Sequence, residues 1–188
     1  MVHRGDLTRT LWLPPGRWVD WWTLAYSTGG QTVTRDAPLD TLPLYLRSGA
    51  LVPMLDPTVD TLVPATTPGV VSAADMADVL DVRGAVDPVT SAARAILADG
   101  TVLEATLGTS VPAVPAGYGT AAGDADLATC TRCARVDPLP GGGFRVRVTT
   151  GRVADERVTA GGVTLHHTAA ATPGVLRARW DLVVLPPA

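Results

Sequence analysis

The chain has 188 residues, a formal net charge of −3 and 18% charged residues. This length accommodates one domain or two small ones, with enough interior for independent folding. No basic surface is available to attract the phosphates of nucleic acid or an anionic membrane, so we expect neither as a partner. No run of about 18 apolar residues occurs, so the sequence predicts no membrane-spanning helix.

The composition is strongly biased. All 15 Lys/Arg-type side chains are arginine, and asparagine is absent, which excludes N-glycosylation within this chain. Because AT-rich codons encode lysine and asparagine, we infer a GC-rich bacterial genome. The first six residues lack the apolar core of a signal peptide. The compartment stays open between cytoplasmic and secreted, and no motif indicates a cofactor.

The aromatic side chains concentrate in residues 11–54, which contain four of the five tryptophans. Large aromatics dominate packing energy, so this stretch has most to bury. Short runs of β-type residues separated by Pro and Gly predict strands here. These are residues 8–13, 18–23, 31–35, 42–47 and 50–54. In the second run tryptophans fall on both faces, so we expect that strand to be covered on both sides.

Several motifs occur in a fixed order within this stretch. They are LPPGRWVDWWT at residues 13–23, Gly29-Gly30, APLD at 37–40, PLYLR at 43–47 and LVP at 51–53. In this order and spacing they resemble the β-sandwich that follows the catalytic barrel in glycoside hydrolase family 31, the α-glucosidase and α-xylosidase family. The resemblance covers about the first third of the chain and weakens after Asp56.

The resemblance implies a parent enzyme that hydrolyses α-glycosidic bonds with retention, using a carboxylate nucleophile and a carboxylic acid/base. In the family both groups lie on the (β/α)8 barrel, so we expect no catalytic residue in this chain and no activity from it alone. Its role would be to brace that barrel, its partner. The resemblance also places further strands before Met1, so we expect a fragment or truncated reading frame; the alternative is the natural start of a short gene.

Residues 57–72 contain three prolines and predict a connector. We place a boundary near Pro64, which separates an incomplete proximal sandwich (1–64) from a distal sandwich (65–188). Residues 72–78 fit either one helical turn, with Ser72 as N-cap and Asp75 in a capping-box position, or an exposed turn. Calcium binding by the aspartates at 75, 78 and 81 would need a glycine-containing loop that is absent, so a surface face is the better interpretation.

The distal part again has a β pattern. Strands are predicted at residues 79–83, 93–98, 101–107, 127–136, 144–149, 158–160, 163–168 and 175–185, with a long loop at 111–126. Asp99-Gly100 favours a type I′ hairpin turn. Arg145 and Arg147 alternate with apolar residues, which predicts a strand with one wet face. Regularly punctuated short strands indicate an all-β chain of antiparallel sandwiches.

A second class of function is a stand-alone carbohydrate-binding module, because tryptophans also stack on sugar rings. It would use an exposed aromatic strip, and α-linked carbohydrate would be the ligand. The candidate residues are Trp18, Trp21, Trp22 and Tyr26, with Asp20 as a hydrogen-bonding partner. Aromatics serve more often as core, so we favour packing for these rings, and a bond to an indole or a turn for Asp20. A small adhesion sandwich unrelated to sugar is a third class.

Cys130 and Cys133 form a C-x-x-C pair. Zinc would need two more ligands. The nearby candidates, His166 and His167, would point to opposite faces of one strand, so Cys130 and Cys133 are weak candidates for a metal site. In an extended segment the two Cα atoms are about 10 Å apart, too far for a disulfide, although a local turn would allow one. We expect two reduced thiols, at least one of them buried.

Overall fold

The computed structural model describes residues 7–108 and 114–187. The chain is nearly all β, as the sequence predicts, and divides into two compact units, Met1–Ser48 and Gly49–Ala188. The division into domains 1–64 and 65–188 stays a prediction; in the structure the segment around Pro64 belongs to the second unit. No helix in the described residues is long and apolar enough to cross a membrane.

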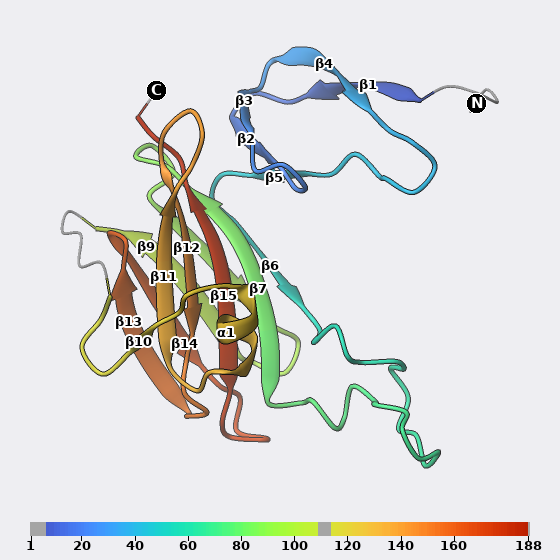
Figure 1. Cartoon of the computed structure of the whole chain (residues 1–188), viewed down its shortest axis with the longest axis vertical. Helices are drawn as coiled ribbons and strands as arrows, with labels where there is room; N and C mark the ends of the chain where they lie inside the picture. The colour runs from blue at the N-terminus through green and yellow to red at the C-terminus, as the bar shows by residue number, and fades with distance from the viewer. Residues whose placement is uncertain (1–6, 109–113, 188) are drawn as a thin grey trace. The chain divides into compact units, whose positions relative to one another are not determined.

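The first unit consists of two small antiparallel sheets (Figure 1). One is a ribbon of β1 (Thr8–Leu13) and β4 (Gln31–Asp36). In the other, β2 (Arg17–Asp20) lies between β3 (Tyr26–Thr28) and β5 (Tyr45–Arg47). Among residues 7–48 of this unit, the buried apolar side chains are those of Leu13, Val19, Ala37 and Leu46.

The predicted strand over residues 18–23 ends earlier, at Asp20. The Asp20 carboxylate accepts hydrogen bonds from the backbone N–H groups of Trp22 (3.0 Å) and Thr23 (2.9 Å), which turns the chain. Leu24 then has a positive φ of 61°. The expectation of tryptophans covered on both faces is therefore wrong, because Trp22 lies in the turn and is 56% exposed.

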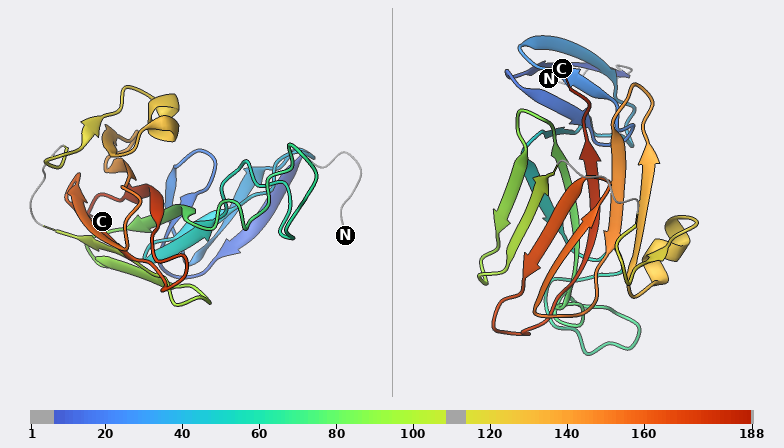
Figure 2. Two further views of the ribbon diagram at one scale, coloured as in Figure 1. Left: turned by 90° about the horizontal axis from the view of Figure 1, so that it is seen from below. Right: turned by 90° about the vertical axis from the view of Figure 1, so that its left-hand side faces the viewer.

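The second unit is a sandwich of a six-stranded and a four-stranded sheet (Figures 1 and 2). The six-stranded sheet has the order β10 (Gly119–Thr120), β11 (Cys133–Pro138), β12 (Phe144–Thr149), β15 (Arg177–Val184), β7 (Val79–Val86), β6 (Ala50–Met54). The four-stranded sheet has the order β13 (Asp155–Ala160), β14 (Val163–Thr168), β9 (Val102–Leu107), β8 (Ala92–Ile96). Most neighbours are antiparallel, but β15 pairs in parallel with β7, and β10 with β11.

The core lies between these two sheets. Val82, Val146 and Leu182 reach it from the six-stranded sheet, and Leu103 and Leu165 from the four-stranded sheet; none is more than 1% exposed. Each such side chain contributes about 1.5–3 kcal/mol through burial. The outer face of the six-stranded sheet, which points away from this core, carries charged side chains that are described below.

The strand predicted over residues 127–136 is partly wrong. Residues Asp124–Thr129 form the helix α1, and β11 begins only at Cys133. The helix buries Leu127 alone, and the Asp126 carboxylate accepts a hydrogen bond from the Ala122 N–H (2.9 Å) at its start. The predicted long loop at 111–126 accordingly contains β10 and the start of α1, and its residues 111–113 lie outside the described residues.

The turn at residues 99–100 differs from the expected form. At Asp99-Gly100 only the glycine has a positive φ (92°), so the turn is not type I′. Leu97 N–H donates to the Thr101 carbonyl (2.9 Å) and Gly100 N–H to the Leu97 carbonyl (3.0 Å), which defines a three-residue loop closed by a left-handed glycine.

Residues 72–78 form turns rather than a helix. The capping contact is nevertheless present, because the Ser72 N–H (2.8 Å) and hydroxyl (2.6 Å) both donate to Asp75 Oδ2. Ser72 and Asp75 therefore close a turn, and the chain does not continue into a helix after it.

Candidate functional site

The predicted carbohydrate-binding residues all lie on the β2–β3–β5 sheet or in the turn after β2. Trp18, Trp21 and Tyr26 are half-buried and Asp20 is buried, whereas Trp22 is exposed. The structure therefore brings these five residues into one small sheet with only Trp22 largely open to solvent.

Their polar atoms have structural partners within the first unit. Trp18 Nε1 donates to the Pro14 carbonyl (2.8 Å), and Trp22 Nε1 donates to the Leu42 carbonyl (2.7 Å). Asp20 caps the turn after β2, as described above, and lies 3.7 Å from Arg35 Nε. These contacts support the packing interpretation for Trp18 and the turn interpretation for Asp20.

The same unit exposes large apolar side chains. Trp12 is 59% exposed and Leu39 is 101% exposed, and Leu7, Leu42 and Leu44 are exposed as well. Trp12 was not among the sugar-stacking candidates, because the alternation of its strand alone does not say which face is open.

The expectation of two reduced thiols is wrong. Cys130 and Cys133 form a disulfide, with their Cα atoms 6.2 Å apart. The chain turns between the end of α1 and the start of β11, and this turn brings the two Cα atoms within disulfide range. In the described residues no group of three or more His, Cys, Asp and Glu side chains is placed to hold a metal ion.

His166 and His167 lie on opposite faces of β14, as expected of neighbours on a strand. His167 is fully buried, and burial lowers the pKa of its imidazole. His166 contacts Glu104 (3.2 Å) through Nδ1 and Asp155 (3.1 Å) through Nε2. Both histidines are therefore engaged within the second unit.

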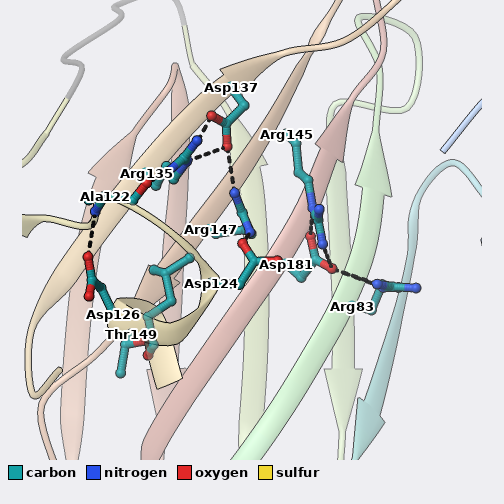
Figure 3. Close-up of polar contacts among 11 residues, drawn as sticks. Arg83, Ala122, Asp124, Asp126, Arg135, Asp137, Arg145, Arg147, Thr149 and Asp181 are labelled. Atoms are coloured by element: carbon teal, nitrogen blue, oxygen red, sulfur yellow. Dashed lines mark hydrogen bonds and ion pairs between the residues drawn. The ribbon is translucent and has the colours of Figure 1, made fainter. Parts of the chain in front are cut away.

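The outer face of the six-stranded sheet carries a lattice of arginine–aspartate pairs (Figure 3). Asp181 on β15 receives two arginines from the strands on either side. Arg145 of β12 donates through Nε (2.7 Å) and Nη2 (3.0 Å), and Arg83 of β7 through Nε (3.1 Å) and Nη2 (2.8 Å). One carboxylate thus links three adjacent strands.

Two further arginines extend the lattice. Arg179 donates from Nε to Asp81 (2.5 Å) and from Nη2 to Asp56 (2.6 Å). Arg147 donates from Nη2 to Asp137 (2.7 Å) and from Nη1 to Asp124 at the start of α1.

Burial and pairing act in opposite directions on the pKa values of these carboxyl groups. Burial alone would raise the pKa of Asp181, but the hydrogen bonds and charges of Arg145 and Arg83 outweigh it and hold that pKa below its usual value. For Asp81 burial dominates, and its pKa is raised in spite of Arg179. The carboxylates of the lattice are therefore partly desolvated, and their hydrogen bonds and ion pairs with the arginines stabilise their charged forms.

The lattice forms the floor of a groove of about 310 Å³. Met54 and Pro57 line it near β6, and Leu127 and Ala128 of α1 line it over β12. We predicted a wet face for β12, and this is wrong for Arg147, which is 8% exposed beneath α1. In the sequence, the lattice is indicated only by charged residues at every second position in β7, β12 and β15. This alternation does not reveal which strands are neighbours.

Known proteins resemble the chain in part. Residues 1–52 match the family model of the glycosyl hydrolase family 31 C-terminal domain. An isomaltosyltransferase from Sporosarcina globispora is 33% identical over 54 residues, which are 29% of this chain and 5% of that protein.

Among solved structures, the cycloalternan-forming enzyme from Listeria monocytogenes, in complex with a pentasaccharide substrate, aligns over 95% of this chain and 18% of its own. Its TM-score is 0.50 at 17% identity, which shows the fold alone. A family 31 dextranase from Flavobacterium johnsoniae, complexed with isomaltotriose, aligns over 89% of this chain and 25% of its own, with a TM-score of 0.46 at 13% identity.

The chain thus spans only a small part of the proteins that it resembles. The comparisons support an accessory domain of a glycoside hydrolase. The resemblance found in the sequence is confirmed: the chain is nearly all β, and its first 52 residues match the model of the glycosyl hydrolase family 31 C-terminal domain.

Proposed function

We propose that the chain is a non-catalytic accessory part of a retaining α-glycosidase resembling family 31, and that its first unit packs against the catalytic (β/α)8 barrel. The exposed apolar side chains of the first unit carry this proposal. A two-stranded ribbon is marginally stable on its own, and the described residues of this unit bury four apolar side chains in all. Covering Leu39, Leu42 and Trp12 with a partner would supply the missing burial.

A binding experiment tests this docking. The DNA upstream of codon 1 is read first, and a barrel encoded in the same frame is produced separately and mixed with the chain. We expect a one-to-one complex in size-exclusion chromatography with light scattering. Leu39→Ser should weaken it at least tenfold, whereas Leu62→Ser, the same change at a 73% exposed site of the second unit, should not.

Two results would contradict the proposal. One is equal weakening of the complex by both serine variants, which would mean that the first unit is not the docking surface. The other is turnover of p-nitrophenyl α-glucoside by the purified chain alone, since the acid and nucleophile of a retaining glycosidase should lie on the barrel.

A stand-alone carbohydrate-binding module is the second candidate, favoured by the open rings of Trp12 and Trp22. It predicts specific retention on immobilised α-glucan. That retention would be abolished by Trp12→Ala or Trp22→Ala without loss of the folded spectrum. Barrel docking predicts no retention of the isolated chain.

A further inference from the structure

We propose that the groove on the outer face of the six-stranded sheet binds a neutral polyhydroxylated ligand of the size of one or two sugar rings. All the residues that line the groove belong to the second unit. Taking a saccharide as the ligand rests on the proposed function, whereas neutrality and polyhydroxyl character are argued from the groove itself.

The shape of the groove suits a small ligand. Its volume of about 310 Å³ is at the lower end of the range of small-molecule sites, roughly 300–1,000 Å³. Apolar side chains stand at both borders: Met54 and Pro57 at one, Leu127 at the other. Between them the floor is polar and rigid, because each of its long side chains is fixed by ion pairs.

The charges of the floor favour a neutral ligand. Asp181 is already paired with Arg83 and Arg145, and Arg179 with Asp81 and Asp56. An anion on the free guanidinium N–H groups would lie beside the aspartates that already neutralise those arginines, and a cation on the free carboxylate lone pairs would lie beside the arginines. Either ion would add an uncompensated charge to a partly buried set whose charges already offset one another, which is costly. A neutral ligand leaves every pair intact.

The hydrogen-bonding capacity that remains matches hydroxyl groups. Arg145 and Arg179 use Nε and Nη2 for their aspartates, so their Nη1 groups are donors that no other described residue engages. Arg147 Nε is a buried donor without a partner among the described residues. The aspartates keep further lone pairs as acceptors. Donors and acceptors therefore lie side by side, and a hydroxyl both donates and accepts.

Titration of the full chain by NMR tests the proposal, with the Nε–H signals of Arg145, Arg147 and Arg179 as reporters. The probes are isomaltotriose and glucose, compared with inorganic phosphate at constant ionic strength. We expect saturable shifts of these signals with a saccharide and none with phosphate.

Two pairs of variants separate the groove from other sites. Ala128→Trp fills the groove from an exposed position of α1, and should weaken binding at least tenfold; Ala125→Trp, on the same helix but outside the lining, should leave it unchanged. Arg145→Gln should also weaken binding at least tenfold. Arg94→Gln, which breaks an exposed ion pair with Glu104 on the other sheet, should not.

Several outcomes would overturn the groove as a polyol site. They are shifts with phosphate only, no shift with any probe, or equal affinity in Ala128→Trp and Ala125→Trp. Saccharide shifts confined to the indole N–H signals of the first unit would assign sugar binding to the tryptophans instead. Retained sheet amide signals in each variant show that the fold is intact. Barrel docking is measured separately with Leu39→Ser, so one proposal can fail without the other.

Discussion

Asp181 illustrates what a single residue does in this fold and what the sequence conceals about it. Its two arginine partners lie 98 and 36 positions away in the chain. Alternation predicts that Asp181 and Arg179 share one face of their strand, and the same holds for Arg145 and Arg147. It cannot predict that these strands are neighbours, or that α1 covers one end of the face.

The Asp181→Asn variant should lose roughly 3 kcal/mol of stability at pH 7, because two partly buried guanidinium groups lose their counter-charge. The folded-state pKa of Asp181 is lowered, so its contribution is present above the unfolded value of about 4 and is lost as the pH falls through the folded value. Urea denaturation of both proteins from pH 7 to pH 3 should show the difference shrinking with acid. A constant difference would contradict this electrostatic origin.

At the scale of elements, the strands with strong β patterns were predictable, and β1, β6, β12 and β14 have the expected bounds. The helix α1 was not predictable, because a helix of six residues with a single buried leucine is too short to show the 3.6-residue hydrophobic periodicity of a helix. The disulfide was missed for the same reason, since the assumed strand kept the two cysteines apart. Tertiary contacts, including the bond from the Thr149 hydroxyl to the Leu127 carbonyl (2.9 Å), hold this helix in place.

The disulfide should make a modest contribution. It closes a loop of four residues, for which chain entropy gives about 2 kcal/mol at most. We expect the Cys130→Ser/Cys133→Ser variant to lose no more than this in urea denaturation, and amide exchange to accelerate in α1 while β12 and β15 stay protected. Without reductant, iodoacetamide should label neither cysteine in the wild type. Ready labelling of the native chain would contradict the disulfide.

The Gly29-Gly30 turn offers a matched pair of substitutions. A Cβ on Gly29 would lie 1.8 Å from the Pro14 carbonyl oxygen and 2.8 Å from Trp18 Nε1, whereas a Cβ on Gly30 would meet nothing within 4 Å. Gly30→Ala should therefore cost about 1–2 kcal/mol, from its positive φ alone. Gly29→Ala should cost clearly more and disturb the tryptophan fluorescence of the native state. Equal effects in urea denaturation would show that the overlap relaxes freely.

At the scale of the whole molecule, the ordered motifs of the first third predicted the resemblance to family 31, whose C-terminal domain model matches residues 1–52. The all-β class was predicted from short strands separated by Gly and Pro. The layout of the second unit did not follow. Its β7 and β15 pair in parallel although paired residues, such as Val79 and Arg177, are 98 positions apart in sequence, and no local pattern encodes such a pairing. Local patterns thus predicted most of the strands, whereas the groove depends on the pairing of strands that lie far apart in the sequence.

The two units should differ in stability when the chain is alone. The second unit has a contiguous core between two sheets, whereas the described part of the first unit, residues 7–48, buries four apolar side chains. Fluorescence can isolate the first unit, because Trp180 is the single tryptophan outside it. In a Trp180→Phe variant we expect the fluorescence transition to occur at lower urea than the loss of sheet circular dichroism. In the wild type, amides of β2 and β5 should exchange faster than those of β7 and β15. Coincident transitions would contradict independent units and weaken the case that the first unit needs a covering partner.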